Sequence, residues 1–230
     1  MSPRKKLLVV LLALVASGDA LRPFEDALGR DLEAADLLYQ PLDINTREEI
    51  GQVSFAIVLG GLRSFVASMM NITGVQKAWS EQDWFEVEEQ FRTIVVLQPR
   101  TRYYWQAASQ QLALNAWADY LDRPGLTDDQ RETRQREVLT KGKEYLRRGM
   151  ESLPDDWRLA HDLAYLNEHP HRPPNDLEAS ADLYQSALDL PGAPKFLRRR
   201  LFYVLNRLPE RREEAYGMSR QLLEDKHHRQ

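Results

Sequence analysis

One helical phrase recurs along this chain of 230 residues. Each copy is a polar helix with a small or aromatic residue at every third or fourth position, and each ends at a proline. The copies run over residues 80–99, 176–191 and, in a weaker form, 142–154. A helix with one apolar face cannot bury that face alone, so repeated units of this kind stack as helical hairpins. Such stacks usually bind other proteins, and the pattern therefore predicts binding rather than catalysis.

Composition excludes several functional classes. Hydrophobic residues make up 43% of the chain and charged residues 29%, as in ordinary globular proteins. The formal net charge of −4 gives no overall field that would attract nucleic acid, so we expect no nucleic-acid partner. The absence of cysteine excludes disulfides, thiolate metal sites and cysteine nucleophiles.

The N-terminus has the layout of an export signal. A basic cluster at residues 4–6 precedes the apolar run of residues 7–16, and small residues follow it at the −3 and −1 positions of a cut after residue 20. Ten helical residues would span about 15 Å, half of a hydrocarbon core of about 30 Å. Residues 1–20 are thus predicted to be a signal peptide or a signal anchor, and both fates stay open. An anchor would attach the chain to the membrane through residues 7–20. The predicted location is exported: periplasmic, or anchored to the inner membrane and facing the periplasm.

The rest of the chain divides at helix signals. Residues 21–45 are predicted to be an amphipathic helix and a linker, residues 46–225 a helical repeat domain, and residues 226–230 a tail. Capping boxes at Thr46 and Thr127 mark helix starts, and Pro99 and Pro191 mark helix ends. No segment alternates with a period of two for long enough to form a strand, so the predicted fold class is all-α.

The segment 50–75 is the most apolar part of the chain after the N-terminus. Its one charge is Arg63, near the middle, where a cation costs about 2.5–3.5 kcal/mol on membrane-insertion scales. We interpret the segment as one or two buried helices, with Gly60 and Gly61 allowing close backbone approach or a kink. The alternative is an integral membrane component with residues 50–75 as a transmembrane helix.

The recurring phrase resembles the tetratricopeptide repeat. That family places small residues where two helices cross, an aromatic early in the second helix and a proline at the end. Residues of these types occupy the corresponding positions in three segments of this chain. They are residues 84–99 (Trp84, Val87, Phe91, Ile94, Pro99), residues 180–191 (Ser180, Tyr184, Ala187, Pro191) and, with a weaker match, residues 142–154 (Gly142, Leu146, Gly149, Pro154). The resemblance implies a right-handed α-solenoid of helical hairpins, here with an N-terminal hydrophobic helix, and a partner protein bound on its concave surface.

A second resemblance covers residues 40–120. The segments 47–52, 59–68, 78–79, 83–84 and 97–100 resemble a set of uncharacterised bacterial envelope proteins, which carry an N-terminal hydrophobic segment before degenerate repeat-like helices. This resemblance implies an envelope location and an interaction role, and it supplies no catalytic residue.

Two groups of side chains are candidate binding residues. The first group consists of the aromatic pairs Trp84–Phe85 and Tyr103–Tyr104. Consecutive helical residues cannot both face a core, so one member of each pair is expected at the surface. The second group is the basic run of Lys195, Arg198 and Arg199. The alternative interpretation is core packing for the aromatics and a solvated, ion-paired face for the basic run.

A metal-dependent enzyme using the histidine region 161–171 is the least favoured alternative. Residues 168–171 spell E-x-x-H, a spacing that di-iron bundles use when both ligands share one helix face. Pro170 removes that shared face, and Asp162 is expected to point to a different side from His161. We therefore predict no catalytic residues, no metal ligands and no cofactor.

Overall fold

The computed structural model describes residues 62–80, 82–169, 172–173 and 175–227. Over these residues the regular structure is entirely helical, which confirms the all-α prediction. The predicted signal segment, the 21–45 region, the capping box at Thr46 and the end of the tail lie outside the described residues, as do residues 170, 171 and 174 of the loop between Glu168 and Asp176.

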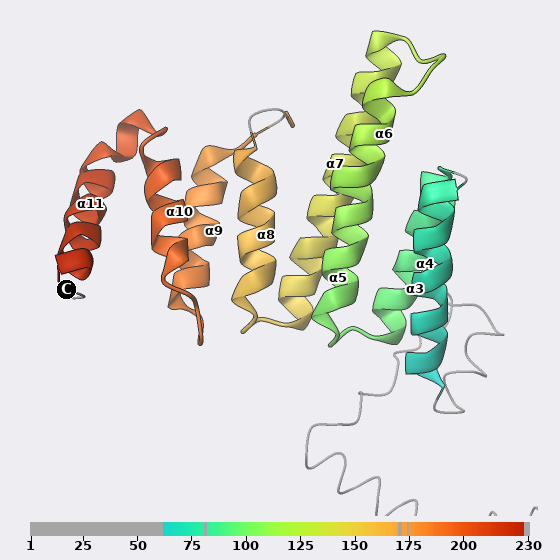
Figure 1. The fold of residues 1–230 in the computed structure, drawn as a ribbon, viewed down its shortest axis with the longest axis horizontal. Helices are drawn as coiled ribbons and strands as arrows, with labels where there is room; N and C mark the ends of the chain where they lie inside the picture. Colours follow the sequence, from blue (N-terminus) through green and yellow to red (C-terminus); the bar gives the residue numbers. More distant parts are fainter. Residues whose placement is uncertain (1–61, 81, 170–171, 174, 228–230) are drawn as a thin grey trace, which may run out of the picture. The chain divides into compact units, whose positions relative to one another are not determined.

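The helices follow one another with short connections (Figure 1). Their bounds are α3 Arg63–Ser80, α4 Trp84–Leu97, α5 Arg102–Ser109, the π-helical η1 Gln110–Ala116, α6 Trp117–Asp122, α7 Asp128–Ser152, α8 Trp157–Glu168, α9 Leu177–Asp189, α10 Phe196–Leu205, the 3₁₀ turn η2 Pro209–Arg211 and α11 Arg212–His227.

Side-chain caps set several helix starts. Asp83 accepts a hydrogen bond from the Glu86 amide (3.1 Å), and Asp176 caps α9 in the same way through the Ala179 amide (2.9 Å). Thr127 and Gln130 form the reciprocal capping box predicted for the start of α7. These bonds satisfy amides that the first helical turn leaves without partners.

Neighbouring helices in the sequence pack as neighbours in space. α3 lies against α4, α5 and η1 lie against α7, α8 lies against α9, and α10 contacts both α9 and α11 (Figure 1). The inward stripe of α4, consisting of Val87, Phe91, Ile94 and Val95, is fully buried. A second cluster joins α8 to α11 around Tyr184 and includes Ala160, Leu197 and Leu201.

The helix over residues 102–122 is continuous but not uniform. Its middle, η1, is wound as a π-helix, and α5 and α6 continue it on either side. A π-turn holds more residues than an α-turn and so changes which side chains face a neighbour. Ala113 and Ala116 of η1 are fully buried, and Gly142 of α7 lies against Ala113.

One loop tip extends beyond the packed part of the domain. α6 and the first half of α7 project past the neighbouring helices (Figure 1). No residue of α6 is buried, and the first buried residue of α7 is Val138. Gln135 of α7 donates to the backbone oxygen of Trp117 (3.2 Å) and thereby joins α7 to α6.

None of the helices in the described part of the chain is both long and apolar enough to cross a membrane. Residues 50–61, the first half of the predicted transmembrane alternative, lie outside that part.

Candidate functional site

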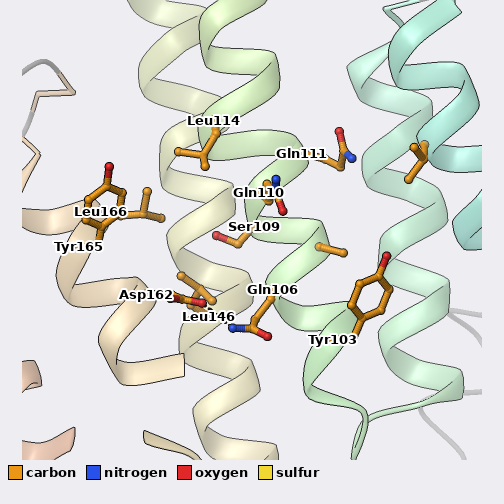
Figure 2. A pocket seen from close by; sticks show the side chains of 12 residues that line it. Tyr103, Gln106, Ser109, Gln110, Gln111, Leu114, Leu146, Asp162, Tyr165 and Leu166 are labelled. Carbon is orange, nitrogen blue, oxygen red and sulfur yellow. Dashed lines mark hydrogen bonds between the residues drawn. The ribbon is translucent and has the colours of Figure 1, made fainter. Parts of the chain in front are cut away.

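A half-open cleft with a volume of about 430 Å³ runs along the helix made by α5 and η1. Tyr103, Gln106 and Gln110 lie on successive turns of that helix and point into the cleft (Figure 2). The other lining residues are Val75 of α3, Ala107, Ser109, Gln111 and Leu114 of α5 and η1, Leu146 of α7, and Asp162, Tyr165 and Leu166 of α8. Side chains from α3 and α8, far apart in the sequence, therefore form its opposite sides.

The α8 side of the cleft is held to α5 by a polar chain. Gln106 donates from Nε2 to Oδ2 of Asp162 (2.6 Å), and Arg102 donates from Nε to Oε1 of Gln106 (3.1 Å). Arg102 also donates from Nη1 to Oδ2 of Asp156, at 2.9 Å. Asp156 caps α8 through the Arg158 amide (3.1 Å). One chain of contacts thus fixes both the cleft and the start of α8.

Asp156 has a lowered pKa. Burial alone would raise the pKa of this carboxyl, but hydrogen bonds from Arg102 and from the Arg158 amide, with the charges of both arginines, outweigh burial. The carboxylate therefore stays charged under physiological conditions and keeps Arg102 in place.

The α3 side of the cleft is joined to the tyrosine pair. Asn71 lies with Nδ2 at 3.4 Å from Oη of Tyr103, and Ser68 shares a hydrogen bond of 3.3 Å with Oη of Tyr104. Tyr103 remains 56% exposed, whereas Tyr104 is buried. Tyr103 therefore lines the cleft while its hydroxyl contacts Asn71 of α3.

Aromatic and cationic groups surround Tyr165 at the other side. The guanidinium of Arg200 lies 5.6 Å from its ring centroid, and the ring of His169 packs edge-on at 5.7 Å. The guanidinium of Arg172 lies over the Trp117 ring, 5.0 Å from its centroid. Burial lowers the pKa of Arg172, although Tyr165 acts in the opposite direction.

A smaller pocket of about 220 Å³ shares Gln111 with the cleft. It is lined by Ala78, Gln82, Trp84, Gln111, Asn115, Ala118 and Asp119. Trp84 donates from Nε1 to Oδ2 of Asp119 (2.8 Å), and Arg123 pairs with the same carboxylate. Arg123 also donates to the backbone oxygen of Gln82 (2.9 Å). Gln82 lies at the turn between α3 and α4 and has a left-handed φ of 53°.

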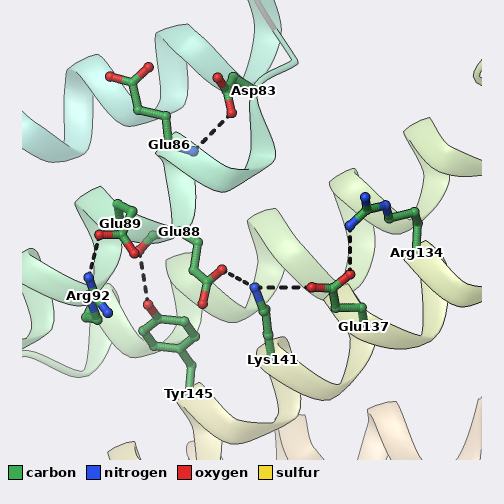
Figure 3. A network of polar contacts seen from close by, with 9 residues as sticks. All are labelled: Asp83, Glu86, Glu88, Glu89, Arg92, Arg134, Glu137, Lys141 and Tyr145. Carbon is green, nitrogen blue, oxygen red and sulfur yellow. Dashed lines mark hydrogen bonds and ion pairs between the residues drawn. The ribbon is translucent and has the colours of Figure 1, made fainter.

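A second polar network connects α4 to α7 (Figure 3). Lys141 of α7 pairs with Glu88 of α4 and with Glu137, and Arg134 pairs with Glu137 in turn. The Tyr145 hydroxyl donates to the backbone oxygen of Glu88 (3.2 Å). Burial raises the pKa of Tyr145, so its hydroxyl keeps the proton that it donates. This network holds in register two of the three hairpins that contribute to the cleft.

The candidate aromatic residues separate as expected for consecutive helical positions. Trp84 and Tyr104 are buried, whereas Phe85 is 71% exposed and Tyr103 is 56% exposed. Tyr103 lines the cleft and Trp84 lines the smaller pocket. Phe85 lines neither pocket.

The basic run lies on α10 and at the turn before it. Lys195, Arg198 and Arg199 are exposed and line neither pocket, while Leu197 and Leu201 anchor the helix in the core. The two groups of candidate binding residues are therefore not brought into one site.

The histidine region is used in helix packing. His161 Nδ1 lies 2.9 Å from Oδ1 of Asp162, which corrects the expectation that the two side chains point to different sides. Adjacent helical side chains diverge by about 100°, but both have enough reach for their tips to meet at the edge of α8. Glu168 is buried, accepts a hydrogen bond from Oη of Tyr184 (3.0 Å) and lies 3.6 Å from Arg200. Among the described residues, which leave out His171, no three histidine or acidic side chains gather as a metal site would require.

Sequence spacing alone does not reveal the most important cleft residues, Gln106, Gln110, Asp162 and Tyr165. The available signal in the sequence is the group of three glutamines at positions 106, 110 and 111. Both carboxylate oxygens of Asp162 already contact protein groups, Gln106 on one oxygen and His161 on the other. The side-chain amide of Gln110, in contrast, is exposed, and it can both donate and accept a hydrogen bond. The cleft is thus equipped to bind polar groups through hydrogen bonds.

Comparison with known proteins adds no relative: no family model, no curated protein and no solved structure matches this chain.

Proposed function

We propose that this chain is a non-catalytic scaffold for protein–protein interaction, built as a tetratricopeptide-like right-handed solenoid. The observation that carries the proposal is the origin of the cleft. Most of its lining comes from α5 with η1 and from α8, and Val75 of α3 lies at one side. These three are the first helices of three successive hairpins. In a stack of hairpins the first helices share one face, and that face is the concave surface on which a partner segment lies.

The chemistry of the cleft fits an extended peptide bound through its backbone. The exposed amide of Gln110 offers a donor and an acceptor to peptide N–H and C=O groups. Tyr103 and Tyr165 provide flat apolar surface at the two sides of the cleft. Asp162 is the one charged side chain among the lining residues, so the fitting segment is polar and largely uncharged.

The proposed location is the bacterial cell envelope. The basic, apolar and small-residue order of residues 1–20 supports export, with the scaffold in the periplasm or held at the inner membrane. We take the partner to be another protein of that compartment.

The test is selection of ligands from a displayed library of random peptides on the full-length chain. Enriched peptides are then measured by fluorescence anisotropy against Gln110→Trp, which places a bulky ring on an exposed position of the cleft. We expect binding to weaken at least about tenfold, a loss of about 1.4 kcal/mol of binding free energy.

The matched control is Thr140→Trp, which adds the same ring to an exposed position of α7 outside both pockets. Peptides should bind this variant as they bind the unaltered chain. Equal binding to all three proteins would refute the cleft as the peptide site, and no enrichment at all would count against a peptide ligand.

A further inference from the structure

The first described helix carries an apolar face that no other helix of the described part covers. Leu62, just before α3, and Phe65, Met69 and Ile72 within it, are 53%, 63%, 46% and 60% exposed. Their spacing of three, four and three residues puts them on one narrow stripe of the helix. We call these four residues the α3 stripe.

The opposite face of α3 is the one that packs against the protein. Ala67 and Ala78 are buried, and Gly74 lies so close to α4 that an added Cβ would meet the Gln90 side chain at 2.8 Å. Lys77 pairs with Glu86 of α4. The α3 stripe is therefore a second face, additional to the one that holds the fold together.

The size of the α3 stripe bears on what could cover it. At the exposures given above, four such side chains present on the order of 400 Å² of apolar surface. A stable protein interface buries about 800 Å² on each partner, so the stripe alone is too small for a second copy of the chain or for a globular partner. A lipid interface needs no matching shape and accepts apolar side chains individually.

The charges around the α3 stripe also favour lipid. α3 contains no acidic residue, and the exposed residues of the stripe are all uncharged. In the sequence, residues 50–62 before Arg63 carry no charge either, so the uncharged stretch extends from Arg63 back to residue 50. A neutral, apolar stripe without nearby carboxylates on its own helix can approach a bilayer without desolvating a charge.

We infer that the α3 stripe contacts the surface of a lipid bilayer, with α3 lying along the interface and its four apolar side chains inserted among the acyl chains. Because the stripe itself is uncharged, this contact depends on apolar burial and responds little to salt. It is distinct from the peptide cleft and does not depend on the function proposed for it.

The absence of cysteine makes a direct test possible. Met69→Cys and Phe85→Cys each introduce a single thiol at an exposed position, one on the α3 stripe and one on α4. Each full-length variant is labelled with an environment-sensitive fluorophore and mixed with vesicles of phosphatidylethanolamine and phosphatidylglycerol. We expect the emission at position 69 to shift to the blue and to be quenched by acyl-chain spin labels, while position 85 does not change.

A second variant separates insertion by the stripe from attachment through residues 7–20. Phe65→Ser with Ile72→Ser, added to Met69→Cys, replaces two exposed side chains and should abolish the blue shift while the protein still sediments with vesicles. The inference is overturned if position 69 does not respond, if positions 69 and 85 respond equally, or if the double replacement leaves the shift intact. It is also overturned if position 69 is shielded before lipid is added, because another part of the chain or a second copy would then cover the stripe.

Discussion

Gly142 lies at the closest approach between α7 and η1. A Cβ at this position would come within 2.6 Å of the Ala113 Cβ and 3.0 Å of its backbone nitrogen. Backbone cannot move aside as a flexible side-chain end can, so Gly142→Ala forces the two helices apart. We expect a loss of about 1–3 kcal/mol in the free energy of unfolding, the usual cost of overpacking.

Gly217 provides the matched control. It lies within α11, and a Cβ there would meet nothing within 4 Å. Gly217→Ala should therefore stabilise the protein by about 0.5–1 kcal/mol through helix propensity alone. Chemical denaturation of the full-length chain followed by circular dichroism measures both variants. Stabilisation by both replacements would show that α7 and η1 are not in close contact.

Asp156 gives a prediction about pH. Its pKa in the folded state lies below the unfolded value of about 3.9, so its contribution is fully present above that pH. The contribution is lost as the pH falls through the lower folded pKa. Asp156→Asn keeps an N-cap side chain but removes the charge, and should cost less than about 1 kcal/mol near pH 7 because the pair with Arg102 is partly exposed.

The measurement is denaturant unfolding of Asp156→Asn and of the unaltered chain at a series of pH values. The difference in stability should be constant from pH 7 to about pH 5 and should shrink below about pH 4. Asp155→Asn removes the same charge from the exposed neighbouring residue and should show no such trend. A difference that grows in acid would contradict the assigned role of Asp156.

At the scale of single residues, the sequence predicts which side chains are exposed better than it predicts which side chains hydrogen-bond to each other. The rule that consecutive helical residues cannot share one face correctly separates Trp84 from Phe85 and Tyr103 from Tyr104. It cannot reveal that Glu168 accepts a hydrogen bond from Tyr184, because that contact depends on how α8 and α9 cross. Burial raises the pKa of Tyr184, with the Glu168 charge acting in the same direction, so the phenol stays protonated and remains the donor.

At the scale of elements, the first half of α7 depends on its cap more than on packing. The capping box of Thr127 and Gln130 closes its start, and its first buried residue is Val138. Thr127→Ala should cost about 0.5–2 kcal/mol locally. We expect amide hydrogen exchange in residues 128–137 to become about fivefold faster for each kcal/mol of local stability that is lost, while exchange in α4 is unchanged.

Thr140→Ala is the control within the same helix. The Thr140 hydroxyl bonds the Arg136 backbone oxygen (2.8 Å) from an exposed position, and this oxygen already belongs to the helical ladder. Its removal should leave exchange in residues 128–137 unchanged. Uniform acceleration along the whole of α7 after Thr127→Ala would mean that the helix opens as one unit and that the cap has no local role.

The helix boundaries were predictable because they depend on local chemistry. Prolines follow the ends of α4 and α9, and aspartate or threonine caps the starts of α4, α7 and α9, close to the predicted boundaries. The π-helical winding of η1 was not predictable, since its residues form an ordinary amphipathic pattern. Ala113 faces Gly142 there, and that close approach is a tertiary contact which no single helix encodes.

At the scale of the whole molecule, the cleft could be predicted as a kind of site but not residue by residue. A stack of hairpins implies a shared surface, and Tyr103 was among its predicted residues. Val75, Gln106 and Asp162 meet only after three hairpins have packed, and no spacing along the chain connects them. The exposed basic residues of α10 were easy to identify and yet line neither pocket.

The proposed solenoid makes a prediction about how stability is distributed. In a one-dimensional stack each hairpin is stabilised by its own contacts and by its neighbours, so damage at one end weakens with distance. Tyr184 is fully buried in the cluster that joins α8 to α11, and Tyr184→Ala should cost about 3–5 kcal/mol there. Hydrogen exchange should accelerate most in α9 and α10, less in α7 and least in α4.

Phe91→Ala, which empties the buried centre of α4, should reverse that order. If either replacement accelerates exchange equally in α4 and α10, the helices form one cooperative core, and the nearest-neighbour stacking on which the proposed peptide-binding surface depends would have to be abandoned.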